Sequence, residues 1–321
     1  MDGSVLLHPT SSLPTASPSS IIPHRVNVTA SKVICKSHQS VVSSLKFFPS
    51  SRVILSSGQD FSLSVIPADL PETFSYQARV VPARVMRGHT GSVTDTAIIG
   101  VGRNVLSSSL DKKVRLWDIS SGDAITTLFA NGPVTAMCLG DRISTPPDGE
   151  EIIAPPSGDS REVPETSSKV VFCALKTGSF QVFDLGFKKS IYTSPASSSL
   201  TSITYSQSST LLATGSSSGV VTLYDARSLS TPLTSFSRMK TEVEDIAFLS
   251  QKNGSGSISL ALVTSDGLPY VASVVPEGPT VCAELVGADC DPVRHVTARD
   301  GRNWTDIWSA SDDGVVRRYI L

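Results

Sequence analysis

The chain has 321 residues, of which 40% are hydrophobic, 17% charged and 6% aromatic, and its net charge is −2. The apolar fraction is large enough for a sizeable core, which excludes wholesale disorder. The near-neutral balance of charges lacks the basic field on which non-specific nucleic-acid binding depends. The chain contains 54 serines. Because serine competes with the helix backbone for hydrogen bonds, this composition favours strands and turns.

The sequence indicates neither a membrane-spanning segment nor a secretory leader. No run of about 18 apolar residues is present, and the first twenty residues lack a basic region followed by a long apolar one. The five cysteines are scattered and form no CxxC pair. We therefore expect buried, reduced thiols and a cytoplasmic and nuclear location.

The first expected element is a short strand close to the N-terminus. Asp2–Leu7 reads as a turn followed by a strand, and Thr10–Ser20 is a spacer rich in Pro, Ser and Thr. Arg25–Lys36 reads as a further strand. We therefore predict a partial first unit and spacer at residues 1–24, followed by the main domain at residues 25–321.

An internal repeat determines the predicted fold class. His38–Ile66 and His89–Trp117 each begin with a His, carry an Asp 22 residues later and end on a hydrophobic residue 6 positions further on. Within each copy, apolar residues alternate with polar ones and turn residues interrupt the alternation, which predicts a four-stranded antiparallel meander. Weaker copies follow to the end of the chain. The corresponding turn positions are 60, 111, 177, 218, 266 and 313.

One interval between these turn positions is longer than the others. It spans 66 residues, from 111 to 177, and contains residues 141–168, which are rich in Pro, Ser and acidic side chains. This composition predicts a disordered insertion between two strands rather than a separate domain.

The His, Asp and Trp at this spacing resemble the WD40 repeat, whose two name-giving dipeptides are intact at Gly88–His89 and Trp117–Asp118. The resemblance implies an all-β propeller. A turn Asp would orient the His, the His would reach a Ser of the second strand, and that Ser, Ser107 or Ser109, would accept the indole N–H. We assign to this structural network His38, Asp60, His89, Ser107, Ser109, Asp111, Trp117, Asp266 and Asp313.

The number of blades is left open between two arrangements. We favour a seven-bladed WD40 β-propeller pattern with an incomplete first blade, made of the strand near the N-terminus and Arg25–Lys36. The alternative is six blades closed by residues 25–36, which would pair with residues 315–320 and cover that edge.

Two segments carry a more specific resemblance. Leu45–Ser50 (LKFFPS) and Gly88–Asp118 are similar to the proteasomal ATPase-associated factor family, within a close match over roughly residues 36–130. The chain starts inside the first blade, so it resembles an N-terminally truncated member. This resemblance implies a chaperone that binds the C-terminal domains of the proteasomal ATPase subunits and assists assembly of the regulatory particle. We expect a monomer that binds neither nucleic acid nor membrane.

The sequence contains no catalytic, metal or cofactor site that we can name. His89, Ser109 and Asp111 offer a superficial Ser/His/Asp set, but the same residues serve the expected structural network. No GxSxG, P-loop or GxGxxG motif is present, and the five histidines lack the spacing of metal ligands. We therefore expect a protein that is not an enzyme.

Charge is distributed unevenly along the chain. Residues 31–130 contain 11 basic and 7 acidic residues, whereas residues 239–321 contain 7 basic and 12 acidic ones. Carboxylates near strand ends of the last two blades form a candidate acidic patch that steers a basic partner. The patch comprises Glu242, Glu244, Asp245, Asp312 and Asp313.

A competing functional interpretation comes from Tyr224–Arg227. This segment resembles the WDxR signature by which WD40 substrate receptors dock onto the adaptor of a cullin-type ubiquitin ligase, with Tyr in place of Trp. In this interpretation Arg227 contacts the adaptor, whereas otherwise it only bonds the edge of its own blade. A generic WD40 scaffold is the third alternative.

Overall fold

The computed structural model describes residues 3–8, 33–68, 79–142, 159–249, 258–275, 278–300 and 305–321. Within these ranges the chain consists of β-strands and one 3-10 helix, η1 (Pro164–Ser168). They fall into two compact units: unit 1 is residues 1–127 with 161–163, and unit 2 is residues 128–160 with 164–321. None of the described residues belongs to a helix long and apolar enough to cross a membrane.

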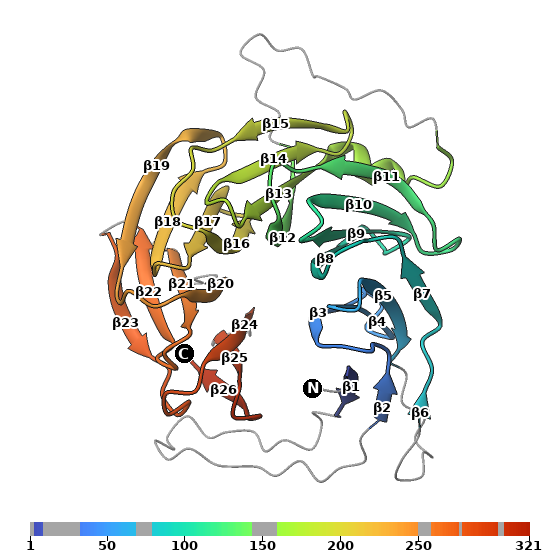
Figure 1. The fold of residues 1–321 in the computed structure, drawn as a ribbon. Coiled ribbons are helices and arrows are strands. Elements are labelled where there is room, and N and C mark those ends of the chain that lie inside the picture. The colour runs from blue at the N-terminus through green and yellow to red at the C-terminus, as the bar shows by residue number, and fades with distance from the viewer. Residues whose placement is uncertain are drawn as a thin grey trace. The chain divides into compact units, whose positions relative to one another are not determined.

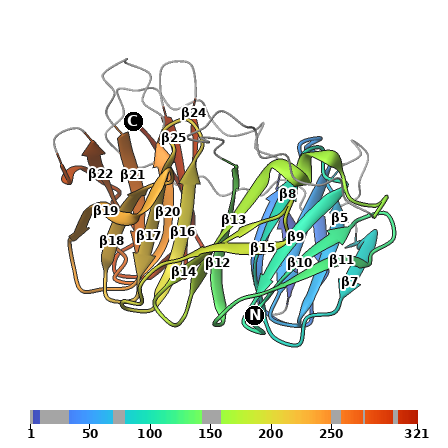
Figure 2. The ribbon, with the colours of Figure 1, turned by 90° about the horizontal axis from the view of Figure 1, so that it is seen from above.

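Unit 1 contains three sheets (Figure 1), with strand orders β1-β2-β6, β3-β4-β5-β7 and β8-β9-β10-β11. The strands are β1 (Ser4–Leu7), β2 (Val33–Lys36), β3 (Val42–Phe47), β4 (Val53–Gly58), β5 (Ser62–Pro67), β6 (Arg79–Val80), β7 (Arg84–Arg87), β8 (Val93–Ile99), β9 (Asn104–Ser109), β10 (Lys113–Asp118) and β11 (Ala124–Phe129). Figure 2 shows β8 to β11 lying next to one another as a single sheet.

Unit 2 contains four sheets whose strands follow in chain order: β12 to β15, β16 to β19, β20 to β23 and β24 to β26. The strands are β12 (Val134–Asp141), β13 (Lys169–Leu175), β14 (Phe180–Asp184), β15 (Lys189–Thr193), β16 (Leu200–Ser206), β17 (Leu211–Ser216), β18 (Val220–Asp225), β19 (Ser228–Ser237), β20 (Val243–Leu249), β21 (Ile258–Thr264), β22 (Tyr270–Val275), β23 (Thr280–Glu284), β24 (Val293–Asp300), β25 (Thr305–Ser311) and β26 (Val316–Ile320). Their first strands β12, β16, β20 and β24 are neighbours in that order.

The predicted repeat is confirmed at the level of sheets. Each of the six turn positions, from residue 60 to residue 313, lies between the second and third strand of an antiparallel meander. The six meanders are the blades of the all-β fold, five with four described strands and one with three. This number agrees with the six-bladed alternative.

A small additional sheet stands at the N-terminal end of unit 1. β1 pairs with β2 from Ser4↔Lys36 to Leu7↔Val33, and β2 also pairs in parallel with β6 through Ile34↔Arg79. β1 and β2 are the strands that the sequence assigned to an incomplete first blade. The pairing invoked for six-blade closure is therefore wrong for residues 33–36, because β2 has a neighbour on both sides. The spacer at residues 10–20 and residues 25–32 lie outside the described residues.

The second strands of five of the six blades are almost entirely buried, and four of these strands contain buried serines. All six residues of β9 are buried, including three serines whose hydroxyls bond to nearby groups. Leu55 and Leu63 of one blade belong to the same apolar cluster as Val105 and Trp117 of the next. Serine suits these strands because a small side chain fits between two packed sheets while its hydroxyl finds a partner.

The predicted insertion is described only in part. Of the predicted insertion 141–168, residues 143–158 lie outside the described part of the chain, whereas residues 159–168 form η1 and the segment before it. The expectation of five buried thiols is wrong for Cys282 and Cys290, which are exposed. Cys282 lies in the mostly exposed fourth strand β23, and Cys290 lies in the connection between β23 and β24.

Candidate functional site

A chain of four side chains links the strands of the β8–β11 blade. Trp117 Nε1 donates to Ser107 Oγ at 2.8 Å, and Ser107 Oγ lies 2.7 Å from His89 Nε2. His89 Nδ1 is 2.9 Å from Asp111 Oδ2. Because a carboxylate only accepts, Nδ1 donates to it, and the neutral ring then accepts the Ser107 hydroxyl at Nε2. Ser109 instead donates to the carbonyl of Gly91.

Electrostatics in this network favour the neutral imidazole. Burial lowers the pKa of His89 below its ordinary value, although the Asp111 carboxylate acts in the opposite direction. Burial would raise the pKa of Asp111, but hydrogen bonds from the Thr90 backbone N–H and the His89 ring lower it overall. Asp111 therefore stays ionised while His89 stays neutral, the combination that the hydrogen-bond directions require.

The pKa shift of His89 predicts a loss of stability in mild acid. The depressed folded-state pKa means that the unfolded chain binds the proton first, so the free energy of unfolding falls as the pH drops below about 6.5. NMR titration of the His89 ring should give a midpoint below that value. Between pH 7.5 and pH 5.5, the free energy of unfolding measured in urea should fall less in His89→Gln than in the wild-type chain. A midpoint at or above 6.5 would contradict this prediction.

The β3–β7 blade holds a shorter version of the network. His38 Nδ1 lies 2.9 Å from Asp60 Oδ1 and His38 Nε2 lies 2.9 Å from Ser56 Oγ. Fully buried Ile66 occupies the position that Trp117 has in the next blade. Ser56 consequently has no indole to bond, and its Oγ also lies 3.3 Å from the carbonyl oxygen of Ser64.

The remaining predicted network residues organise their own turns. Asp266 accepts from the Leu268 N–H and from the hydroxyls of Thr241 and Thr264. Asp313 accepts from the Val315 N–H, Ser311 and Arg317. The hydrogen bond from Arg317 is the main cause that lowers the pKa of Asp313 well below its ordinary range. The hydrogen bonds described for these two carboxylates involve no His.

Three of the five acidic residues predicted to bind a partner, Glu242, Glu244 and Asp312, lie around an arginine that the sequence analysis overlooked, whereas Asp313 pairs with Arg317. Arg294 Nη1 lies 2.7 Å from Glu244 Oε1, and its Nη2 lies 2.7 Å from Asp312 Oδ2. Glu242 is close enough to act electrostatically on both Glu244 and Arg294. Glu242, Glu244, Arg294 and Asp312 form what we call the Arg294 cluster. With three carboxylates and one guanidinium, the cluster has a formal charge of −2.

The charges in this cluster are not equivalent. Burial is the main cause that raises the pKa of Glu244, and the neighbouring Glu242 and Asp312 carboxylates add to it against the opposing effect of Arg294. The hydrogen bond from Arg294 lowers the pKa of Asp312. For Glu242, the structure gives no side-chain hydrogen bond among the described residues, so this carboxylate is the member best placed to meet a partner.

Asp245 follows Glu244 in the sequence, but its carboxylate has partners other than Arg294. Its Oδ2 accepts from the backbone N–H of Val296 at 3.1 Å and lies 2.5 Å from His295 Nδ1. Its Oδ1 accepts from the N–H of Ile246 at 2.8 Å. Asp245 therefore joins β20 to β24, so its carboxylate holds two blades together rather than facing a partner.

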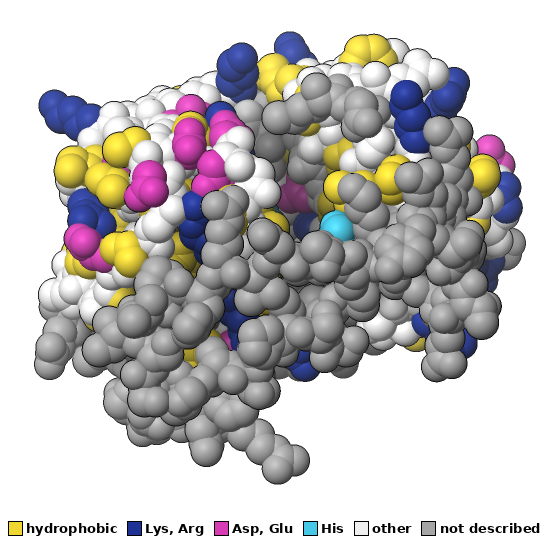
Figure 3. Space-filling view, turned by 90° about the horizontal axis from the view of Figure 1, so that it is seen from below, with side chains coloured by type: hydrophobic (Ala, Val, Ile, Leu, Met, Phe, Trp, Pro, Cys, Tyr) yellow, Lys and Arg dark blue, Asp and Glu magenta, His cyan; other side chains and the backbone are white. Residues whose placement is uncertain are grey.

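A signal for Arg294 existed in the repeat. Val243-Glu244-Asp245 opens β20 and Val293-Arg294-His295 opens β24, so each acidic residue has a basic counterpart 50 positions later. Aligning the two blades residue by residue would have placed these side chains on neighbouring strands. Figure 3 shows acidic side chains gathered on part of the drawn surface with Lys and Arg side chains among them.

Arg227 is engaged within its own motif. Its Nε and Nη2 donate to the Asp225 carboxylate at 2.9 and 2.6 Å, and its backbone N–H donates to the same group at 2.9 Å. The guanidinium therefore folds back onto its own blade. This geometry agrees with the interpretation in which Arg227 bonds the blade edge, and nothing in it favours a ligase adaptor.

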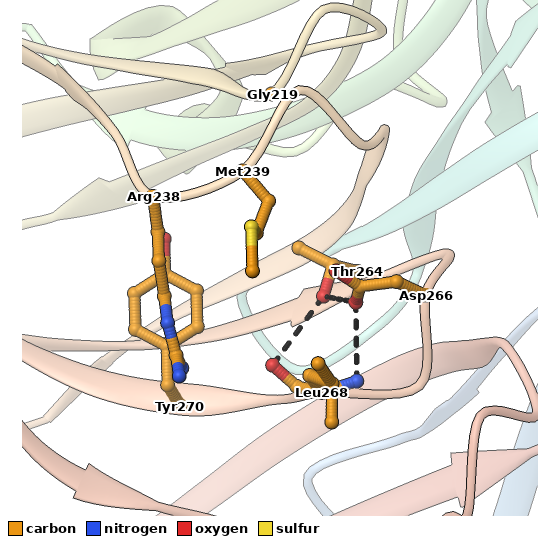
Figure 4. Close-up of a pocket in the computed structure, with 7 residues that line it drawn as sticks. All are labelled: Gly219, Arg238, Met239, Thr264, Asp266, Leu268 and Tyr270. Carbon is orange, nitrogen blue, oxygen red and sulfur yellow. Dashed lines mark hydrogen bonds between the residues drawn. The ribbon is translucent and has the colours of Figure 1, made fainter.

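A pocket in unit 2 is too small for an organic ligand (Figure 4). Arg238 lies over the Tyr270 ring at 4.9 Å, and Thr264, Asp266 and Leu268 form its other wall through their own hydrogen bonds. The enclosed volume of about 10 Å³ corresponds to one water molecule. The described residues also include no group of three side chains suited to a metal ion.

Comparison with known proteins identifies the repeat and several partial relatives. Residues 30–66, 81–118 and 188–225 match the model of the WD domain, G-beta repeat. A segment of 142 residues, 44% of this chain, is 29% identical to the 26S proteasome regulatory subunit RPN14 of Saccharomyces cerevisiae, of which it covers 29%. A segment of 65 residues, 20% of this chain, is 38% identical to WD repeat-containing protein 18 of Bos taurus, covering 15% of it. The matched segments thus span less than a third of either relative.

Proposed function

We propose that this chain, whose WD40 repeats form an all-β propeller fold of six blades, is a non-catalytic protein-binding scaffold for the proteasome regulatory particle. Its partners in this proposal are the C-terminal domains of the proteasomal ATPase subunits, and its role is to assist or regulate their assembly. The observation that carries the proposal is the similarity of 44% of the chain to a yeast protein named as a 26S proteasome regulatory subunit.

The Arg294 cluster supplies a surface for such a partner. Arg294 is half exposed and Asp312 is one-third exposed, so the cluster reaches solvent. A formal charge of −2 attracts a basic surface and speeds its encounter, while rim charges of this kind contribute more to association rate and specificity than to affinity. The proposed mechanism is steric: the scaffold occupies one ATPase domain and controls which subunit docks next.

The binding test uses purified C-terminal domains of the proteasomal ATPase subunits as the probe. Glu242→Lys combined with Glu244→Gln should weaken binding about tenfold, because it removes the unpaired carboxylate and one paired one. Binding of the wild-type chain should also weaken between about 50 and 300 mM salt, since exposed charges are screened over this range. Biolayer interferometry measures both effects.

Glu165→Lys is the matched control, because Glu165 is an exposed carboxylate of η1 outside the cluster. Its affinity should stay within twofold of wild type. If none of the ATPase domains binds the wild-type chain, the proposed function is wrong. If a domain binds but the double variant and the control bind it with the same affinity, the proposed partner is right and the Arg294 cluster is not the binding surface.

A further inference from the structure

The turn between the second and third strands of every blade contains one residue with positive φ. This conformation suits glycine, since a side chain there meets the backbone. The residues are Phe61 (φ 67), Lys112 (φ 65), Gly178 (φ 90), Gly219 (φ 82), Gly267 (φ 75) and Gly314 (φ 76). A bulky aromatic residue at this position is an outlier, and such strained residues concentrate at functional sites.

Phe61 does not compensate for this conformation by burial. Its side chain is 44% exposed, and its backbone N–H makes a long turn hydrogen bond to the carbonyl of Gly58 at 3.3 Å. Burial of a phenylalanine side chain is a principal source of its stabilising effect. An exposed aromatic ring held in a strained turn therefore costs stability without an evident gain inside the blade.

The ring borders a pocket in unit 1. The pocket has a volume of about 200 Å³ and is lined by Gln39, Asp60, Phe61, Arg87 and His89. This is large enough for an amino-acid side chain, unlike the pocket of Figure 4. Arg87 lies on β7 directly opposite Ser62 of β5, so it is next to Phe61 across the strand pair.

The carboxylate and the imidazole that line this pocket already have hydrogen-bond partners. Asp60 accepts from His38, from the N–H of Gln39 and from the hydroxyl of Ser62. His89 is bonded through both ring nitrogens to Asp111 and Ser107. The floor of the pocket therefore offers fixed, satisfied groups rather than free carboxylates.

One basic side chain, Arg87, lines the same pocket, and two others lie near its His89. Arg87 is exposed, and Lys113 and Arg115 lie close enough to His89 to disfavour its protonated form. Arg115 also lies against the backbone of Gly88, and its buried Nε has no hydrogen-bond partner among the described residues. An exposed aromatic side chain beside an exposed guanidinium complements an apolar side chain next to a carboxylate.

We propose that Phe61 and Arg87 form a docking site for a peptide segment of a partner protein in which an apolar residue adjoins an Asp or Glu. The exposed Phe61 side chain contacts the apolar residue at the mouth of the pocket, while Arg87 pairs with the carboxylate, bidentately where the geometry allows it. The site belongs to unit 1 and uses none of the residues of the Arg294 cluster.

The test is an array of octapeptides. Each peptide contains one Asp or Glu and one apolar residue, and the array varies the apolar residue and the number of residues between the two. Matched spots carry Lys in place of the acid, and an octameric oligouridylate is a separate probe. The wild-type chain should bind acidic spots in preference to the Lys spots and to the oligouridylate. Fluorescence anisotropy with the best acidic peptide should then show affinity losses of about tenfold or more for Phe61→Gly and for Arg87→Glu.

Lys36→Glu, a reversal of another exposed cation in unit 1, is the control and should change the affinity less than twofold. Phe61→Gly should unfold thermally at or above the wild-type temperature, because glycine relieves the positive φ. The proposal is overturned if the Lys peptides or the oligouridylate bind as well as the acidic peptides. It is also overturned if Phe61→Gly leaves peptide affinity unchanged or lowers the unfolding temperature, which would make Phe61 a structural residue.

Discussion

Replacing Ser107 with alanine should lower the free energy of unfolding by about 2–4 kcal/mol, because one hydroxyl serves two buried partners. Ser107 is fully buried, accepts the Trp117 N–H at 2.8 Å and lies 2.7 Å from His89 Nε2. Alanine leaves the indole N–H without an acceptor and the imidazole without a donor, and both rings are buried. Urea unfolding followed by far-UV circular dichroism measures the loss.

Ser56→Ala is the matched control, because Ser56 has the same place in the preceding blade. Ser56 bonds to His38, but Ile66 stands where the indole would be. Only one ring nitrogen is left without its partner there, so the loss should be about half as large, roughly 1–2 kcal/mol. Equal losses for the two variants would show that the indole hydrogen bond contributes nothing, which contradicts the prediction.

Replacing Asn104 with alanine should destabilise unit 1 by about 1–3 kcal/mol and release the segment that precedes η1. The Asn104 amide is fully buried in β9. Its Nδ2 donates to the carbonyl of Arg161 at 3.0 Å, and its Oδ1 accepts from the N–H of Val163 at 2.7 Å. These two bonds mimic a strand pair, so their loss frees a segment about 60 residues distant in sequence from its anchor.

Hydrogen exchange of the Val163 amide is the local measurement for Asn104→Ala. The amide should exchange at least about tenfold faster than in wild type, since its acceptor is gone. Asn131→Ala, which removes an exposed amide between β11 and β12, should leave the rate unchanged. Unaltered exchange in Asn104→Ala would mean that other contacts hold the segment.

The repeat made the blades predictable because its signals are local. A His, an Asp 22 residues later and a turn between alternating runs are all visible in one stretch of sequence. Even the weak copy around Ser218 was placed correctly, because a Ser/Gly turn separates the apolar start of β17 from the apolar residues of β18. Local periodicity therefore suffices for strand order within a blade.

Features that depend on contacts between blades were not predictable in the same way. β6 is only two residues long, and it joins β2 in parallel although the chain around it belongs to the next blade. The choice between Ser107 and Ser109 depends on which hydroxyl faces the His, a matter of register that alternation alone leaves open. Arg294 was missed because its partners lie 50 residues before it and 18 after it.

The last described sheet has a consequence for solubility. In the described part of the chain β26 has one neighbouring strand, and Val316 and Ile320 are 63% and 41% exposed. Such an edge is a template for pairing with another molecule. Arg317 and Arg318 interrupt it, and their ion pairs with Asp313 and Asp306 keep both charges in place along the strand. These arginines place charge along the edge, as gatekeeper residues do, at a blade that has three strands in the described part of the chain.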